Sequence, residues 1–518
     1  MKNRLSISHA RTLAPFFAIV AVLLAFGASC TSGFGRTGPG SRLTVFIAKG
    51  NTGSPTERLP LSFTNPTDLV VRVEARKSDG TLDTDMNGFV RLSSKPGSVV
   101  GLVGEGTNGR NVQMKNGVAD AVSVQIIAAY GDARIWAEDI GYTPADPTRN
   151  PPPQCADGLD NDGNGLADYP LDPGCAFAND DAEGTASYAT GASDTLFFVS
   201  PRIADVRGAL FGPAGVRQGG TNTPFSKEQV AIDTGFRPVD RKFAFNTVVT
   251  RIAPDGFYVT DTGEGNDFGS VFAFTFSAPP GLRVCDRLKT LNGTAVDFFG
   301  FTELSFPTWS IQQWNPRSPD PDVAACHVPD PHEIADEELA DKQALFRWES
   351  ALVRLTQEGA RSLNVSAKFG PEFPKAPDYA PEENATNCDL NKDGRVAFDV
   401  EPEKTCNDKC TGDPQCTEYS NFAAQSNFMV AVGNSENQTL YKMQVDTSSS
   451  AKFDPLAMRG KPLRALTGTL RYFSGGSQFT LEVRCDDDLV VDLAGTPMST
   501  REACVRPRTE IDLNENTQ

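Results

Sequence analysis

An acidic segment between two cysteines contains the residues of this chain best suited to bind a metal ion. It runs CADGLDNDGNGLADYPLDPGC from Cys155 to Cys175. Ca²⁺ takes six to eight oxygen ligands, which alternate side chains around a glycine turn supply together with a backbone carbonyl. The spacing therefore predicts a Ca²⁺ site; the alternative is a solvated acidic linker. The expected ligands are Asp160, Asp162, Asn164, the backbone carbonyl of Leu166, and Asp168, with Asp157 or Asp172 completing the shell.

This segment resembles the Asp-rich calcium repeats of thrombospondin type 3 and of related bacterial surface proteins. In those repeats a flanking disulfide closes the loop. The resemblance therefore implies a Ca²⁺ cofactor and a bridge between Cys155 and Cys175.

A second acidic loop, DLNKDGRVAFDVE, occupies residues 389–401. It resembles an EF-hand or dockerin-type loop in its first half. Val400 stands where the closing carboxylate is usual, so a neighbour must supply that ligand. The alternative is an acidic turn held by disulfides. The expected ligands are Asp389, Asn391, Asp393, the backbone carbonyl of Arg395, and Asp399 or Glu401.

The cysteines predict a disulfide framework. Eleven are present, and ten remain if Cys30 carries a lipid. An even number in an oxidising compartment favours disulfides. A zinc site in the cluster 388–416 is the alternative, although its spacing is not that of two CxxC pairs. The expected bridges are Cys155–Cys175, Cys285–Cys326, Cys485–Cys504 and two among Cys388, Cys406, Cys410 and Cys416, whose connectivity stays open.

The first thirty residues predict export. A basic start (Lys2, Arg4, Arg11) precedes an apolar run over 12–26 and small residues before Cys30, as in a signal peptide. The run is shorter than the roughly 20 residues that a membrane-spanning helix needs. Gly-Ala-Ser-Cys resembles the bacterial lipobox, although Gly27 stands where Leu is usual. This resemblance implies that Cys30 is lipidated and begins the mature chain; an ordinary secretory signal is the alternative.

By the same resemblance, Thr31 after the cysteine implies delivery to the outer membrane or cell surface of a Gram-negative bacterium. The membrane is then a partner through the lipid. Removal of residues 1–29, which carry three basic and no acidic side chains, moves the formal net charge from -18 to -21. So acidic a chain disfavours nucleic acid as a partner.

The strand patterns predict a mainly β fold. Val122, Val124 and Ile126 alternate with polar residues, as half-buried strands do. Residues 42–144 resemble bacterial immunoglobulin-like (Ig-like) surface domains. The stretches 255–261 and 284–304 resemble the OB-fold modules found beside secreted bacterial nucleases, which implies a first barrel in this part of the chain. An internal sequence repeat indicates a second OB-like copy. Its first copy contains Leu291, Gly293, Thr294, Phe298 and Gly300, and the second contains Leu466, Gly468, Thr469, Phe473 and Gly475 at the same spacing.

The expected architecture is an Ig-like sandwich followed by two OB-like Greek-key barrels with calcium-loop and disulfide insertions. The expected limits are 1–29 for the signal peptide, 30–41 for a tether, 42–144 for the sandwich, 145–190 for a Pro-rich linker with the calcium motif, 191–320 for the first barrel, 321–340 for a linker, 341–505 for the second barrel with an insertion at 376–424, and 506–518 for a tail.

No catalytic residue is expected. The sequence has no GxSxG elbow, HExxH, P-loop or GxGxxG after a strand. His327 and His332 lie in the expected linker and have two readings, a metal site or a solvated linker. Carboxylate pairs are sufficient for glycoside chemistry, but they occur throughout so acidic a chain.

Three functions follow, in order of support. The first is a calcium-stabilised envelope lipoprotein that acts as a surface binding or scaffold protein for a protein or glycan partner. The second is an accessory protein that binds single-stranded nucleic acid on exposed aromatics, with Tyr258, Phe299 and Tyr472 as candidates that are alternatively core residues. The third is an unfamiliar carboxylate-based hydrolase.

Overall fold

The computed structural model describes residues 41–62, 65–84, 86–104, 107–141, 150–161, 163, 165–172, 175, 188–208, 223–263, 267–357, 361–365, 427–433, 439–450, 453, 458, 461–473, 478–491 and 497–505. Strands dominate these residues, which confirms the mainly β fold class. The chain divides into two compact units, residues 1–199 and 200–518. Among the described residues, no helix combines the length and apolar character needed to cross a lipid bilayer.

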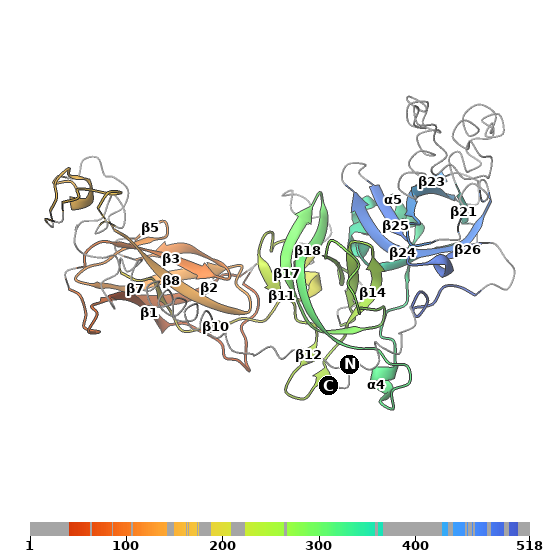
Figure 1. The fold of residues 1–518 in the computed structure, drawn as a ribbon, viewed down its shortest axis with the longest axis horizontal. Coiled ribbons are helices and arrows are strands. Elements are labelled where there is room, and N and C mark those ends of the chain that lie inside the picture. The colour runs from red at the N-terminus through yellow and green to blue at the C-terminus, as the bar shows by residue number, and fades with distance from the viewer. Residues whose placement is uncertain are drawn as a thin grey trace, which may run out of the picture. The chain divides into compact units, whose positions relative to one another are not determined.

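The first unit contains two antiparallel sheets that share one core (Figure 1). Val71 and Val124 from one sheet and Leu92 and Ile135 from the other are buried together. The first sheet has the order β1 (Arg42–Lys49), β2 (Thr67–Arg76), β7 (Val118–Ile127), β4 (Ser98–Val103). The second has the order β10 (Leu196–Phe197), β8 (Asp132–Gly141), β3 (Phe89–Lys95), β6 (Asn111–Gln113), β5 (Thr107–Asn108), and β9 (Gly191–Ala192) also pairs with β8.

This order matches the immunoglobulin arrangement. With β1, β2, β3, β4, β7, β8 and β10 taken as strands A to G, the sheets read A-B-E-D and G-F-C. In β7, Val122, Val124 and Ile126 are at most 1% exposed. The alternating pattern of the sequence therefore marks the inward face of this strand.

The sandwich extends beyond its expected limit at residue 144. Ala192 in β9 pairs with Trp136, and Leu196 in β10 pairs with Ala133, both in β8. The cysteine-bounded acidic segment is thus inserted between two strands of one domain and does not join two domains. The sequence pattern missed this because β9 and β10 are only two residues long each.

The first half of the second unit, residues 223–312, is a five-stranded Greek-key sheet. Its order is β14 (Thr247–Ala253), β15 (Gly256–Asp261), β16 (Ser270–Phe274), β18 (Phe301–Gln312), β17 (Arg287–Phe298), with β16 and β18 parallel. A single residue pair, Val248 with Arg287, links β14 back to β17. The short strand β11 (Gln229–Ala231) adds to β17, and β12 (Phe236–Arg237) pairs with β13 (Lys242–Phe243).

The second half, from residue 332 onward, repeats this order. Here β20 (Leu352–Thr356) pairs with β24 and β21 (Ser362–Val365) pairs with β22, so the two together take the place of β14. The strands β22 (Asn427–Gly433), β23 (Thr439–Asp446), β25 (Gln478–Glu482) and β24 (Leu463–Phe473) follow, with β23 and β25 parallel. Two further short strands add to this sheet: β19 (His332–Glu333) pairs with β20, and β26 (Leu489–Val491) pairs with β24.

Both halves therefore have the strand order of the OB-fold, a partly open Greek-key barrel, but their closure is incomplete. The internal sequence repeat lies on equivalent strands of the two halves, with Gly293 in β17 and Gly468 in β24. A Cβ at position 468 would lie 2.5 Å from the Glu482 carbonyl oxygen of β25, and one at position 293 would lie 3.3 Å from that of Ser305 in β18. Close approach of a neighbouring strand accounts for a glycine at both positions.

Short helices and two disulfides complete the second unit. The bridges Cys285–Cys326 and Cys485–Cys504 are confirmed, as is Cys155–Cys175 in the first unit. The expected linker 321–340 contains two of the helices. The helices are α2 (Ile203–Val206), α4 (Pro321–Ala324), α5 (Asp336–Ala340) and α6 (Lys342–Leu345), with 3-10 turns η1 (Gln154–Ala156), η3 (Phe346–Trp348) and η5 (Asp486–Asp488).

Candidate functional site

In the calcium segment, residues 155–175, carboxylates hold turns of their own backbone. Asp160 accepts hydrogen bonds from the backbone N–H groups of Gly163 at 2.8 Å and Gly165 at 2.9 Å. Asp168 accepts one from the N–H of Gly158 at 2.9 Å. These contacts explain why glycines and aspartates alternate here, since a short acidic side chain can cap a tight turn.

The structure describes only some of the other predicted ligands of the calcium segment. Asp157 accepts a hydrogen bond from the Leu159 N–H at 2.8 Å, and Asp172 is buried. Asp162 and Asn164 lie outside the described residues. The donors have the oxygen chemistry that Ca²⁺ prefers, but within the described part of the chain no group of three or more Asp, Glu, His or Cys side chains is arranged to hold a metal ion. Ca²⁺ therefore stays a prediction.

Several predicted sites lie outside the described residues. They are the lipidation site Cys30, the second acidic loop at 389–401 with all its expected ligands, and the cysteines 388, 406, 410 and 416. Nothing in the fold tests them.

The two histidines of the expected linker contact separate carboxylates. His327 Nε2 lies 3.2 Å from Asp322 Oδ1. His332 stacks on Trp348, with ring centroids 3.5 Å apart, and its Nε2 lies 2.9 Å from Glu338 Oε2. Neither belongs to a metal-binding group among the residues that the structure describes. Both carboxylates belong to the segment 321–340 itself, and the stacking of His332 on Trp348 joins this segment to the 3-10 turn η3.

A buried ionic cluster joins the two halves of the second unit. From the first half, Arg251 in β14 forms an ion pair with Glu482 of β25, and the Tyr258 hydroxyl donates a hydrogen bond to the same carboxylate at 2.6 Å. From the second half, Arg471 in β24 lies 3.5 Å from the other oxygen of Glu482. Arg251, Tyr258 and Glu482 are all buried. The face of β14 and β15 is thus covered by β24 and β25.

The protonation states of this cluster follow from its charges. Burial alone would raise the pKa of Glu482, but Arg251 and Arg471 outweigh burial and lower it. Burial and the nearby Glu482 raise the pKa of Tyr258 well above its ordinary value. The tyrosine therefore stays protonated and donates to an ionised carboxylate. Since the cluster is buried and its charges face one another, it serves to hold the halves together.

A second buried ion pair involves Arg207, which precedes the first half in the sequence and contacts both halves. Arg207, at the end of α2, lies 3.2 Å from Glu349. The Arg207 guanidinium also donates to the backbone carbonyls of Ser270 at 2.7 Å and Phe346 at 2.8 Å. Both charged side chains are 2% exposed. The two OB-like halves therefore form one body through contacts that are sensitive to loss of a single charge.

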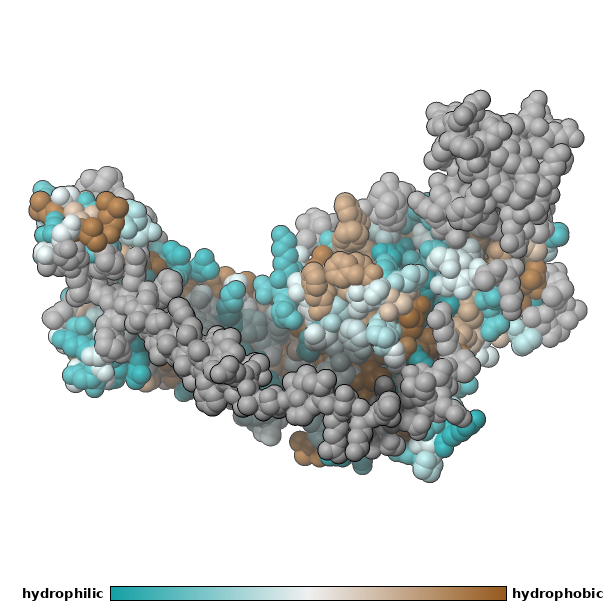
Figure 2. Space-filling view, viewed as in Figure 1, coloured by the Kyte–Doolittle hydropathy of each residue, from teal (hydrophilic) through white to brown (hydrophobic). Residues whose placement is uncertain are grey.

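A row of aromatic rings leads outward from the ionic cluster to solvent. The Phe272 ring lies 4.7 Å from that of Tyr258 and 6.4 Å from that of Phe274. Phe276 lies 4.4 Å from Phe274 and 5.6 Å from Phe306. Phe272 is fully buried, whereas Phe276 is 65% and Phe306 70% exposed. We call Phe274, Phe276 and Phe306 the phenylalanine surface; Figure 2 shows apolar residues gathered on the visible face near β18.

The backbone of the exposed rings is strained. Phe276 has φ of 65° and Phe306 has φ of 52°. Phe299, in the turn between β17 and β18, has φ of 51° and is 68% exposed. Left-handed backbone is rare for bulky residues and costs about 1–3 kcal/mol. Rings that are both strained and exposed contribute little to folding.

The chain around the phenylalanine surface is uncharged. Residues 274–282, 290–296 and 304–312 contain no Asp, Glu, Lys or Arg, in a protein of which 22% is charged. Beside Phe306, Thr290 Oγ1 lies 2.8 Å from Ser310 Oγ, and Asn292 Nδ2 donates to Thr308 Oγ1 at 3.2 Å. These four residues form a hydroxyl–amide strip across β17 and β18.

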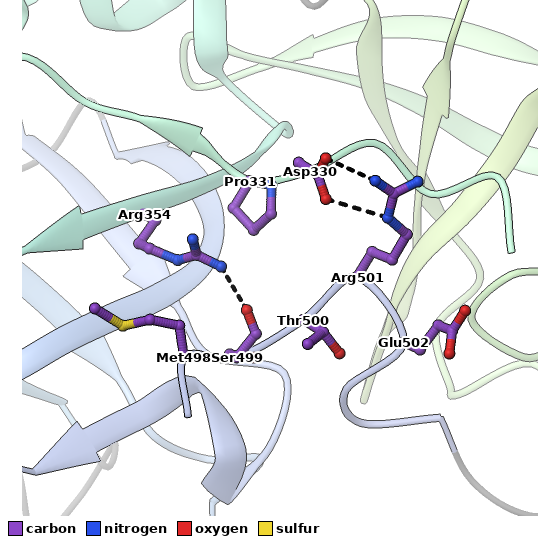
Figure 3. A pocket seen from close by; sticks show the side chains of 8 residues that line it. All are labelled: Asp330, Pro331, Arg354, Met498, Ser499, Thr500, Arg501 and Glu502. Carbon is purple, nitrogen blue, oxygen red and sulfur yellow. Dashed lines mark hydrogen bonds and ion pairs between the residues drawn. The ribbon is translucent and has the colours of Figure 1, made fainter. Parts of the chain in front are cut away.

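A separate cavity of about 510 Å³ lies beside the C-terminal segment of the second unit (Figure 3). Its two guanidiniums are already engaged by the protein. Arg501 pairs with Asp330 at 2.6 Å, and Arg354 contacts the Ser499 carbonyl and Glu333. This cavity is therefore a weaker candidate for ligand binding than the phenylalanine surface.

Of the three aromatic residues suggested to bind single-stranded nucleic acid, two pack in the core and one is exposed. Tyr258 is fully buried, and Tyr472 packs against the core of the second half. Phe299 alone of the three is exposed. Sequence reasoning missed Phe276 and Phe306, because phenylalanines in uncharged stretches resemble core residues.

No protein-family model matches the chain, and no curated protein is similar to it at a significant level.

Proposed function

We propose that this protein is a non-catalytic binding protein of the bacterial cell envelope, which contacts its partner through the phenylalanine surface. The observation that carries the proposal is the pair of rings at Phe276 and Phe306, which are exposed, in mutual contact and in left-handed backbone. Contiguous exposed apolar groups on a soluble protein mark interaction sites. The Ig-like sandwich suits a spacer that holds this surface away from the membrane.

The buried carboxylates do not favour a hydrolase. Glu482 faces Arg251 and Arg471 in the interior of the second unit and is 6% exposed. A general acid or base must come within hydrogen-bond reach of a substrate. The uncharged stretches that contain Phe276 and Phe306 likewise disfavour single-stranded nucleic acid, whose phosphates require basic side chains.

The double variant Phe276→Ala/Phe306→Ala tests this proposal. The purified mature chain is titrated in parallel with neutral glycans, a peptide library, phosphatidylcholine vesicles and oligo-dT. We expect saturable binding to one of the first three classes, weakened at least tenfold by the double variant, since removal of central aromatic rings costs more than about 1 kcal/mol each. Phe46→Ala, which removes a 42% exposed ring of the first unit, is the matched control and should change affinity less than twofold.

Binding that survives the double variant would contradict the proposed surface. Salt-sensitive binding of oligo-dT alone would replace it with the nucleic-acid function.

The envelope location rests on the lipobox-like sequence at Cys30. We expect the chain to incorporate labelled palmitate and to partition into the detergent phase of Triton X-114. Cys30→Ser should abolish both, because the thiol is the acylated group. Persistence of the label in that variant would rule out lipidation at this position.

The calcium segment is proposed to bind Ca²⁺ and stiffen the insertion between β8 and β9. We expect excess Ca²⁺, but not Mg²⁺, to raise the melting temperature of the first unit; a concentration of 100 Kd stabilises by about 2.7 kcal/mol. Asp162→Ala should remove most of this rise, while Glu57→Ala, at an exposed position of the same unit, should leave it intact. Equal responses of both variants would argue against the site.

A further inference from the structure

We propose that the ligand of the phenylalanine surface is an uncharged polysaccharide, which lies along the β17–β18 ribbon from Phe276 and Phe306 across the hydroxyl–amide strip. This inference rests on the proposed function and names its ligand class.

The two features adjoin along β18. Thr308 and Ser310 are exposed and alternate with more buried residues, so they share a face, and exposed Phe306 precedes them at an irregularity in the pairing of β17 with β18. Asn292 is directly opposite Thr308, and Thr290 is opposite Ser310. From Phe306 to Ser310 the strand advances about 13 Å at the usual rise of a β-strand. The strip therefore continues from the rings for a length that suits a few linked sugar rings.

The chemistry of this face matches that of a neutral sugar. A sugar ring has an apolar face of C–H groups, which an exposed phenylalanine ring can cover, and hydroxyls around its edge. The hydroxyls of Thr290, Thr308 and Ser310 each donate and accept hydrogen bonds, and the Asn292 amide does both. Sites that combine aromatic contact with a few such polar groups fix the orientation of small ligands.

The absence of charge distinguishes this ligand from the other candidates. No charged residue occurs in 274–282, 290–296 or 304–312, so a polyanion gains no ion pair there. A lipid surface would bury the strip without replacing its hydrogen bonds to water, which is costly. A neutral, hydroxyl-rich polysaccharide can contact the phenylalanine rings through its C–H groups and form hydrogen bonds with the hydroxyl–amide strip.

The test is a glycan array that holds neutral and anionic glycans, probed with the mature full-length chain. We expect binding to neutral glycans only. In titrations with the best neutral oligosaccharide of the array, Phe306→Ala and Phe276→Ala should each weaken binding at least tenfold. Thr308→Val, which keeps the shape but removes the hydroxyl, should weaken it about threefold to tenfold, as expected for one hydrogen bond. Thr308→Ser should restore it, and Phe46→Ala should have no effect.

Two failures are distinguishable. If no neutral glycan binds but a peptide or a vesicle binds in a manner that Phe306→Ala abolishes, the sugar ligand is wrong and the binding surface stands. If neutral glycans bind equally well to Phe306→Ala, Phe276→Ala and Thr308→Val, the β17–β18 face is not their site, and both the inference and the proposed surface fail.

Discussion

Replacement of Glu482 by Gln is expected to lower the free energy of unfolding of the second unit by about 3–5 kcal/mol, the usual cost of breaking a buried ion pair from one side. The carboxylate faces Arg251 and Arg471 and accepts a hydrogen bond from Tyr258. The amide cannot balance either guanidinium, and Arg251 is only 2% exposed, so its charge would stay buried without the carboxylate that pairs with it.

Urea unfolding followed by tryptophan fluorescence measures this loss. In a Trp136→Phe background, the remaining tryptophans, at 309, 314 and 348, all lie in the second unit. Glu333→Gln is the matched control, because Glu333 pairs with Arg354 at a side-chain exposure of 49% and such pairs contribute about 0–1 kcal/mol. A loss below 1 kcal/mol for Glu482→Gln would show that the cluster does not hold the halves together.

The same variant has a defined pH dependence. The folded pKa of Glu482 is lowered below its ordinary 4.5, so its stabilisation is fully present above pH 4.5 and is lost as the pH falls toward the folded pKa. Because Gln does not titrate, the difference in stability between wild type and Glu482→Gln should narrow below pH 4.5. A difference that stays constant from pH 7 to pH 3 would contradict the ionised state of this carboxylate.

Loss of the Cys285–Cys326 disulfide is expected to cost the second unit about 4 kcal/mol. The bridge spans 41 residues, and a closed loop of that size restricts the unfolded chain to about this extent. Both cysteines are buried with Val248 of the first half and Leu352 of the second, so the bridge also fixes a core shared by the halves.

The double variant Cys285→Ala/Cys326→Ala tests this prediction in the same urea assay. Cys155→Ala/Cys175→Ala removes a bridge of the first unit and should leave the unfolding of the second unit unchanged. If Cys285→Ala/Cys326→Ala unfolded at the same urea concentration as wild type, the predicted stabilisation by the Cys285–Cys326 bridge would be wrong.

Local patterns sufficed for much of the fold. Alternation in β7 predicted its buried face, and the spacing of Gly293 and Gly468 predicted a repeated strand order. Three disulfides followed from cysteines that are neighbours along the sequence. Each of these features depends on residues close together in the chain or on one strand.

The features that the sequence did not reveal depend on distant partners or on backbone conformation. Arg251 and Glu482 are 231 residues apart, so neither predicts the other. The strands β9 and β10 are too short to show a period, and they are separated from β8 by the calcium segment. Phe276 and Phe306 resemble core residues by type, but in the structure both are exposed and have left-handed backbone.

The central claim, that the phenylalanine surface is the binding surface, is tested most directly by hydrogen–deuterium exchange of the mature chain with and without the tightest ligand of the four classes. We predict protection of peptides that cover residues 274–282 and 304–312, with the strands of the first unit unchanged. Protection confined to the first unit, or to the cavity lined by Asp330 and Arg501, would contradict the claim.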